Sequence, residues 1–138
     1  MYKVQSIRQI HKMKILLILT SFLILGKIST AQSLAGIWKG TSFCQVKNSG
    51  CHDETVVYHV SKGSTSNSYQ ISASKVIDGK ENDMGTLNFN FDPEQKTLLL
   101  VDSVQQIKWE FKITGKEMHG TLISKGTLFR KINLIKTD

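Results

Sequence analysis

Apolar and polar residues alternate along most of the chain from position 34 onward. In the segment 107–113, IKWEFKI, every second residue is apolar, with Lys or Glu between. The segment 86–91, TLNFNF, repeats this pattern with Leu and Phe against Thr and Asn. Successive side chains of a β-strand point to opposite faces, so strict alternation predicts strands with one buried face. By this pattern we expect eight strands, at 36–46, 54–61, 69–77, 86–91, 96–103, 107–113, 118–123 and 128–135.

Short segments rich in Gly, Pro, Asn, Asp and Ser separate the expected strands, for example 48–50, NSG, and 92–94, DPE. Gly tolerates positive φ, Pro fixes a corner, and the polar residues bond to nearby backbone, so these segments favour turns. Connections this short force consecutive strands to pair antiparallel. No stretch after the first 31 residues shows a helical period. The sequence therefore predicts an all-β fold, an antiparallel eight-stranded up-and-down meander.

A sheet with one apolar face has to cover that face, by folding into a sandwich or by closing into a barrel. Consecutive hairpins favour the barrel, because a sandwich usually needs a longer crossover connection. An eight-stranded barrel is just wide enough to be filled by side chains or to hold one small ligand. The many aromatic residues favour a filled core; the alternative is a lined cavity in which Tyr58 and Arg130 bind an amphipathic ligand. The residues expected inside are Trp38, Val56, Tyr58, Val60, Ile71, Ala73, Leu87, Phe89, Phe91, Trp109, Phe111, Ile113, Met118, Leu122, Leu128, Ile132 and Leu134.

The first 31 residues carry the pattern of a secretory signal peptide. Lys12 and Lys14 precede an uncharged apolar run, Ile15 to Leu25, and the small residues Ser29 and Ala31 follow it. A basic start, a short apolar run and a small-residue exit are typical of such leaders. The run is about half as long as the roughly 20 residues that a membrane-spanning helix needs.

We expect cleavage after Ala31, with Met13 as an alternative start of translation. The exported product is then a single domain, residues 32–138, in a periplasm or outside the cell. No cysteine lies near Ala31 to carry a lipid, so no membrane anchor is expected after cleavage.

The net charge of the chain falls when the residues of this leader are left out. The chain has 18 Lys and Arg against 11 Asp and Glu, a net charge of +7. Five of the 18 basic residues lie in the leader, which has no acidic residue, so 13 basic residues remain against 11 acidic ones, a net of +2. The basic pI is mainly a targeting feature, and we expect no nucleic-acid partner. The five are Lys3, Arg8, Lys12, Lys14 and Lys27.

Cys44 and Cys51 are the two cysteines of the chain. In an oxidising compartment such a pair predicts a disulfide, which would stabilise the fold by about 2.5 kcal/mol on the chain-entropy model. We expect no metal, because a two-cysteine zinc knuckle usually has two to four residues between its cysteines and a second ligand pair. The alternative metal or thiol site would add His52, Asp53, Glu54 and His59.

The segment 44–54, CQVKNSGCHDE, is the densest polar stretch. It predicts either a solvated hairpin tip or a rigid recognition loop, because a disulfide lowers the entropy lost when a loop is ordered on a partner. Catalysis is not expected, since His52 and Asp53 would point to opposite faces of a strand and no base is oriented by a third group. No cofactor is expected either. The residues of a partner loop would be Lys47, Asn48, His52 and Asp53.

Gly36 and Trp38 at the start of the first strand, with Arg130 on the last strand, form a pattern that resembles the calycin superfamily of lipocalins, fatty-acid-binding proteins and avidins. The resemblance implies a small barrel in which the Trp38 indole plugs one end and the Arg130 guanidinium packs across it. Arg130 shares its face with apolar residues such as Ile132, so a stack on Trp38, worth about 2 kcal/mol, would give the guanidinium a partner.

Two functions follow from these patterns, and an enzyme that uses the cluster His52, Asp53, Glu54 and His59 is a third, less favoured alternative. A calycin-like carrier would bind one small apolar or amphipathic molecule inside the barrel, which requires a cavity of roughly 300 Å³ or more. The alternative is a protein-binding module, such as an exported inhibitor of a protease or a lysozyme, that acts through the Cys44–Cys51 loop. In either case we expect a monomer. The ligand-binding residues of the carrier would be Trp38, Tyr58, Phe89, Trp109, Phe111 and Arg130.

Overall fold

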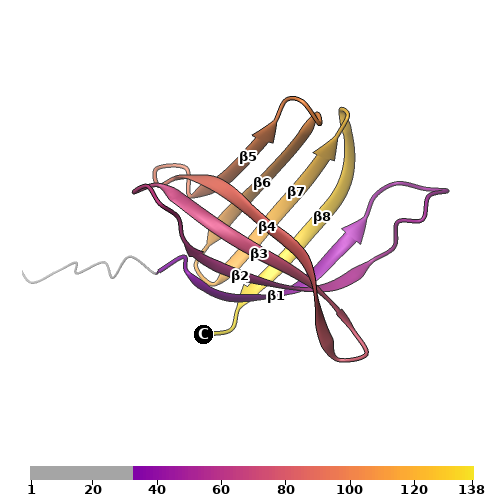
Figure 1. Ribbon diagram of the computed structural model, residues 1–138, viewed down its shortest axis with the longest axis horizontal. Helices are drawn as coiled ribbons and strands as arrows, with labels where there is room; N and C mark the ends of the chain where they lie inside the picture. The colour runs from indigo at the N-terminus through magenta and orange to yellow at the C-terminus, as the bar shows by residue number, and fades with distance from the viewer. Residues whose placement is uncertain (1–32) are drawn as a thin grey trace, which may run out of the picture. The chain divides into compact units, whose positions relative to one another are not determined.

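Eight β-strands follow one another along residues 33–138, the residues that the computed structural model describes (Figure 1). Each expected strand is present, and only the fourth differs much in length. The expected signal peptide lies outside the described residues. The strands are β1 (Gly36–Cys44), β2 (Glu54–Lys62), β3 (Ser68–Ile77), β4 (Lys80–Asp92), β5 (Thr97–Asp102), β6 (Ile107–Thr114), β7 (Glu117–Ser124) and β8 (Thr127–Lys136).

Each strand pairs antiparallel with the next, and β1 also pairs with β8, so the sheet closes into a barrel. The β1–β8 ladder runs from Trp38 opposite Lys136 to Cys44 opposite Arg130. The predicted all-β meander barrel is therefore confirmed. Closure gives the apolar faces a common interior and removes the two free edges of the meander. No helix in residues 33–138 is long and apolar enough to cross a membrane.

β4 is longer than the sequence predicts, because it begins at Lys80 rather than Thr86. Residues 80–85, KENDMG, show no apolar alternation, and most of them are exposed. They pair with β3 across a two-residue turn, Asp78 and Gly79, in which both residues have positive φ (51° and 74°). Turns of this kind match the twist of a β-hairpin. Pairing with β3, rather than burial of an apolar face, thus makes this segment a strand.

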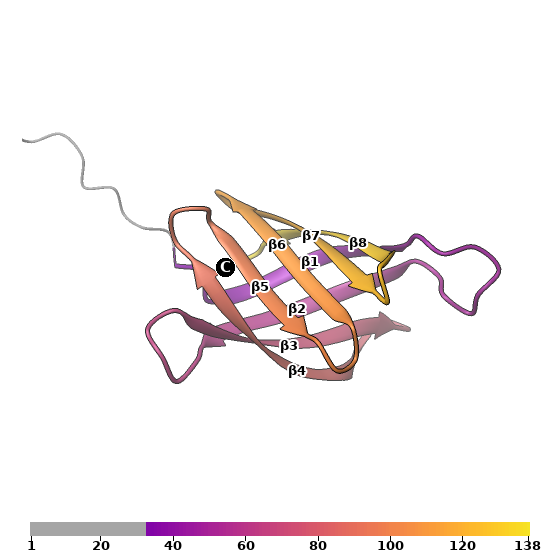
Figure 2. The same ribbon diagram turned by 90° about the horizontal axis from the view of Figure 1, so that it is seen from above.

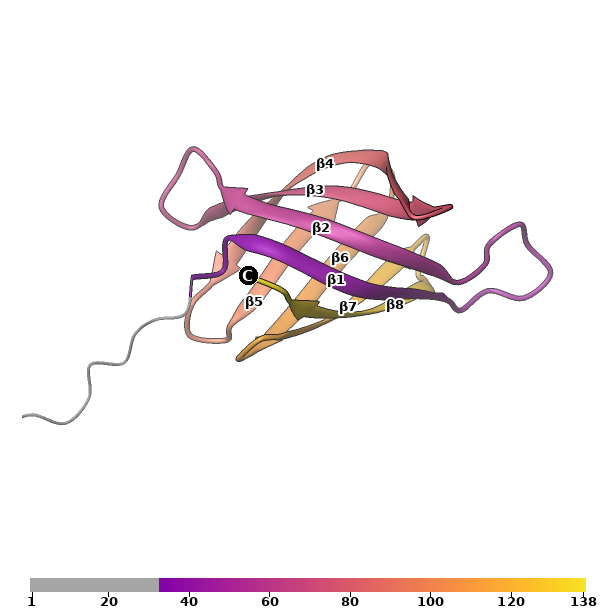
Figure 3. The ribbon, with the colours of Figure 1, turned by 90° about the horizontal axis from the view of Figure 1, so that it is seen from below.

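The two ends of the barrel differ. At the closed end, where β1 begins, Trp38 is 1% exposed and its indole Nε1 donates a hydrogen bond to the Leu34 carbonyl at 3.0 Å. The opposite, open end carries the β1–β2, β3–β4, β5–β6 and β7–β8 connections. The β1–β2 loop projects beyond the strands in Figures 2 and 3.

Side chains from alternate strand positions fill most of the interior. Leu98 belongs to this core although the sequence does not place it there, because the run Leu98-Leu99-Leu100 has no alternation from which to read a phase,. The largest fully buried apolar side chains are Trp38, Val56, Leu98, Phe111, Met118, Ile132 and Leu134.

Gly40 on β1 makes the close approach of β1 to β8 possible. A Cβ at this position would collide with the backbone carbonyl of Asn133, which has no rotamer into which it can move away. We therefore expect Gly40→Ala to lower the free energy of unfolding by about 2 kcal/mol, within the range for overpacked cores. Urea unfolding followed by tryptophan fluorescence measures this change. Gly50→Ala is the control, because nothing lies within 4 Å of its Cβ position; equal stability of the two variants would contradict the expectation.

Candidate functional site

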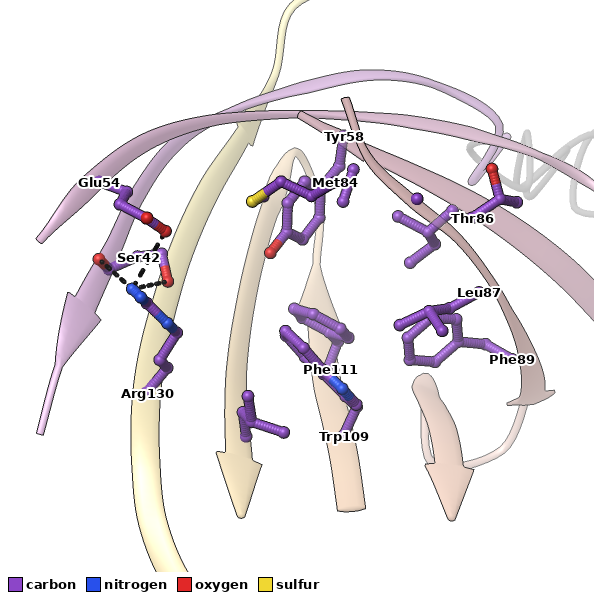
Figure 4. Close-up of a pocket in the computed structure, with 14 residues that line it drawn as sticks. Ser42, Glu54, Tyr58, Met84, Thr86, Leu87, Phe89, Trp109, Phe111 and Arg130 are labelled. Carbon is purple, nitrogen blue, oxygen red and sulfur yellow. Dashed lines mark hydrogen bonds and ion pairs between the residues drawn. The ribbon is translucent and has the colours of Figure 1, made fainter. Parts of the chain in front are cut away.

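A cavity of about 470 Å³ lies in the open end of the barrel. Figure 4 shows aromatic and aliphatic side chains over most of its lining, with the charged side chains of Glu54 and Arg130 together on one side. The expectation of a filled core is therefore wrong for the open end, although it holds at the closed end. Trp38 lies at the closed end and does not line the cavity. The expected ligand-binding residues that do line it are Tyr58, Phe89, Trp109, Phe111 and Arg130.

Phe111 on β6 is the centre of an aromatic cluster that forms the cavity floor. Its ring centroid lies 5.7 Å from that of Phe89 and 6.1 Å from that of Tyr58, both edge to face. The Trp109 indole is stacked on the same ring at 5.9 Å. Gly120 lies opposite Phe111 in the β6–β7 ladder, and a Cβ there would collide with the ring. The absence of a side chain at Gly120 thus lets the Phe111 ring lie flat across the barrel wall.

Three polar side chains from neighbouring strands form the rim of the cavity: Ser42 on β1, Glu54 on β2 and Arg130 on β8. Ser42 lies opposite Glu54, and Arg130 lies opposite Cys44, two residues further along β1. Residues an even number of positions apart on a strand face the same side. Glu54 therefore faces inward like Tyr58, and by the same rule Ser42 faces inward like Trp38 and Arg130 like Ile132. Closure of the barrel therefore gathers the three at one point of the mouth.

The Arg130 guanidinium joins the rim through its Nη1 atom. Nη1 donates to Ser42 Oγ at 3.2 Å, to the Ser42 carbonyl at 3.4 Å and to the His52 carbonyl at 3.2 Å. It also lies 3.3 Å from Glu54 Oε2, and both charged side chains are only 14% exposed. Removing one member of such a pair would leave the other charge buried without a partner, which is strongly destabilising. The ion pair therefore holds the rim in one arrangement.

The predicted stack of Arg130 on Trp38 is wrong. The two residues are six positions apart along the β1–β8 ladder, which is about 20 Å at the rise of a β-strand. Lys136 is the residue opposite Trp38, and its ammonium group lies 3.4 Å from Asp138 Oδ1. The register between the first and last strands is set by barrel closure, so the two sequence positions alone could not reveal the separation.

The Tyr58 hydroxyl points into the cavity on the side of the rim (Figure 4). The residue is 3% exposed, and burial raises the pKa of its phenol well above the ordinary value. The positive charge of Arg130 opposes this rise and the negative charge of Glu54 adds to it, both by less than burial does. Within residues 33–138 the hydroxyl takes part in no hydrogen bond. It is therefore a protonated donor that faces the cavity.

The cavity also reaches the seam between β4 and β5. These strands share only three residue pairs, next to their common turn, and then diverge (Figure 1). Residues 84–87 of β4 line the cavity beyond the last pair. Met84 is the extra residue of a β-bulge against β3,. Met84 and Leu87 are 44% and 39% exposed, so this side of the mouth is apolar and in contact with solvent.

The predicted disulfide between Cys44 and Cys51 is confirmed, with the two Cα atoms 5.8 Å apart. Asp53 also holds the loop, because its carboxylate accepts a hydrogen bond from the Cys44 N–H at 2.8 Å. Of the expected partner-loop residues, Lys47 and Asn48 are exposed at the loop, whereas the Asp53 carboxylate is engaged by the loop itself. The structure thus presents a tethered polar loop next to the rim.

The side chains of His52, Asp53, Glu54 and His59 do not converge on one point. Glu54 turns inward to Arg130, whereas the His59 ring contacts Glu81 at 2.8 Å on the outer surface. His52 is exposed and contributes its backbone carbonyl, not its ring, to the rim. Within residues 33–138 no group of three or more His, Cys, Asp or Glu side chains is placed to hold a metal ion.

Sequence reasoning missed Ser42 and Glu54 as parts of the cavity rim. Glu54 has charged neighbours in the sequence, but it shares its strand face with Val56 and Tyr58. This shared phase is a signal that could have placed its carboxylate inside the barrel. Ser42 is four positions after the inward-facing Trp38 on the same strand, so its side chain is also expected to face inward,.

No protein-family model, no curated protein and no solved structure matches this chain. The closed eight-stranded antiparallel barrel is compatible with a calycin-like fold. A functional assignment therefore rests on the geometry of the cavity and its rim.

The raised pKa of Tyr58 predicts a loss of stability at high pH. The folded chain holds the phenolic proton more tightly than the unfolded chain, in which the pKa is about 10. The contribution is therefore complete below pH 10 and decreases above it, by up to about 1.4 kcal/mol per pH unit. Urea unfolding between pH 9 and pH 11 should show this decrease for the wild type relative to Tyr58→Phe, in which it is removed. Parallel stability curves for the two proteins would contradict the burial of a protonated phenol.

Proposed function

We propose that this protein is an exported, calycin-like carrier that binds one small apolar or amphipathic molecule in the open end of its barrel. The observation that carries the proposal is the cavity of about 470 Å³, with an aromatic floor and a polar rim. Ligand sites in proteins usually measure about 300–1,000 Å³ and combine an apolar lining with a few placed polar groups. The cavity has both properties.

The size of the cavity limits the ligand. If each non-hydrogen atom takes about as much space as a water molecule in the liquid, roughly 30 Å³, the cavity holds about 15 such atoms. A medium-length alkyl chain with a small head group, or one fused ring system, fits this limit. Trp109 and Leu87 are partly exposed in the cavity wall. An apolar ligand would remove their surface from water, which contributes about 25 cal/mol for each Å².

Two features support export. The disulfide between Cys44 and Cys51 is of a kind that persists in oxidising compartments,. The first 31 residues carry the sequence pattern of a secretory leader,. The calycin-like assignment is supported by the meander barrel and by the burial of Trp38 where the first strand begins.

A neutral fluorescent probe such as N-phenylnaphthylamine tests the carrier function. We expect saturable binding at one site per chain, with quenching of Trp109 fluorescence, because this indole lies in the cavity wall. Trp38 is buried at the closed end, farther from the probe, and should be quenched less. Trp109→Phe should therefore reduce the quenching while the probe still binds. A wild-type protein that shows no saturable binding would contradict the proposal.

Two substitutions on β3 provide a matched pair for the same titration. Ala73 lines the cavity, whereas Gln70 is exposed on the outer face of the strand. Ala73→Phe should fill part of the cavity and lower probe affinity at least about tenfold, whereas Gln70→Phe should leave it within about twofold. Equal affinity of the two variants would show that the probe binds elsewhere.

The projecting β1–β2 loop supports a second candidate function, that of a protein-binding module such as an inhibitor of a protease or lysozyme. The loop is held by the Cys44–Cys51 disulfide and by the Asp53 hydrogen bond. A loop fixed in this way loses little entropy when a partner binds it. Its exposed residues include Lys47 and Asn48.

Inhibition assays against a panel of proteases and lysozymes test this second candidate. If the loop is the inhibitory site, Lys47→Glu should raise the inhibition constant about tenfold or more, because it reverses an exposed charge at the loop. Lys125→Glu, on the β7–β8 turn, carries the same charge change outside the loop and should have no effect. Inhibition that is unchanged by Lys47→Glu would exclude the loop as the site.

A further inference from the structure

The charges that face the cavity cancel. Of the residues that line it, only Glu54 and Arg130 carry charged side chains, and their 3.3 Å contact leaves the rim neutral. A carboxylate head group would compete with Glu54 for the guanidinium, and an ammonium group would compete with Arg130 for the carboxylate. Each would leave one rim charge without its partner, and both side chains are only 14% exposed. Burial of an unpaired charge is costly, so the rim disfavours either ion.

The rim nevertheless has hydrogen-bond donors that bond to no described residue. An arginine has five N–H donors, and within residues 33–138 the Arg130 guanidinium makes its hydrogen bonds and its ion pair through Nη1 alone. The N–H groups of Nε and Nη2 make no hydrogen bond to a described residue. The Tyr58 hydroxyl adds another donor that faces the cavity and is bonded to no described residue.

The charged pair and the largely apolar β4 wall lie on different sides of the cavity, and the Thr86 hydroxyl lies on the β4 side. Figure 4 shows Arg130 and Glu54 on one side, Leu87 and Phe89 on the other, and the Tyr58 hydroxyl and the Phe111 ring between them. A molecule that lies across the cavity would therefore place its polar head at the rim and its apolar part against β4. This arrangement fits a ligand with one small polar end.

We propose, on the basis of the carrier function above, that the cavity selects uncharged amphipathic molecules whose head group presents an acceptor oxygen. Esters, ketones and primary amides belong to this class, and carboxylates and amines of the same chain length are disfavoured. Tyr58 and Arg130 donate to the acceptor oxygen. Glu54 determines the specificity, because it neutralises the guanidinium that would otherwise bind an anion.

Displacement of N-phenylnaphthylamine from the purified chain tests this selectivity. The four competitors carry the same ten-carbon chain and differ in the head group: methyl decanoate, decanamide, decanoate and decylamine. The two uncharged molecules should displace the probe at concentrations about tenfold lower than the two ions. Decanoate or decylamine that binds as tightly as decanamide would overturn the inference.

Glu54→Gln separates recognition at the rim from simple partitioning into an apolar cavity. This variant leaves the Arg130 charge unneutralised, so the affinity for decanoate should rise about tenfold while that for decanamide stays within about threefold. Glu81→Gln is the matched control, because Glu81 pairs with His59 on the outer surface. It should change neither affinity. An unchanged affinity for decanoate in Glu54→Gln would overturn the role of Glu54.

Tyr58→Phe is a second variant that keeps the buried ring and removes only the hydroxyl, so it tests the donor even if Glu54→Gln does not fold. It should lower the affinity for decanamide about three- to tenfold, as expected for the loss of one hydrogen bond, and should lower the affinity for the probe by less, because the probe has no acceptor oxygen. Equal decanamide affinity would overturn the role of Tyr58. Failure of the wild type to bind the probe or any competitor would instead refute the carrier function itself, so the two failures are distinguishable.

Discussion

Seven residue pairs between β1 and β8 turn a meander of hairpins into a barrel. This ladder joins the first strand to the last, and closing so long a loop has an entropic cost that local hairpins do not have. Without it the apolar face of the sheet would stay in contact with water and no interior would exist. The same ladder brings Ser42 next to Arg130, 88 positions later in the chain, and so creates the rim of the cavity. The fold and the candidate site therefore both depend on the pairing of the first strand with the last.

The alternation of side chains predicted the fold well because a half-buried strand has to follow it. The alternation did not predict strands or buried residues correctly in segments whose structure is not set by the burial of one apolar face. Residues 80–85 of β4 are polar and are ordered by pairing with β3, and the leucines at 98–100 bury only alternate members of an unbroken apolar run. The stack expected between Trp38 and Arg130 failed for a different reason. The resemblance supplied the two residues, but the register of β1 against β8 places them at opposite ends of the barrel.

The candidate site was predictable in part. Aromatic residues such as Phe89 and Phe111 were expected inside from their phase, and Tyr58 and Arg130 were expected as polar groups of a cavity. These side chains can either fill the barrel or line a cavity, and the outcome depends on how closely their rings pack against one another. Because the rings cluster around Phe111, which lies flat against Gly120, space remains above them at the open end. The number of aromatic residues in the sequence does not reveal how their rings are arranged, and so does not predict this cavity.

The short β4–β5 ladder has a consequence for the wall of the barrel. Only three residue pairs hold this seam, whereas each of the other seven ladders has six or more. Among all ways to open the wall, parting here breaks the fewest backbone hydrogen bonds, and local opening follows the least stable contacts. The seam adjoins residues 84–87 of the cavity. Opening at this seam would give the proposed ligand a path through the barrel wall that leaves the closed end and the rim ion pair intact.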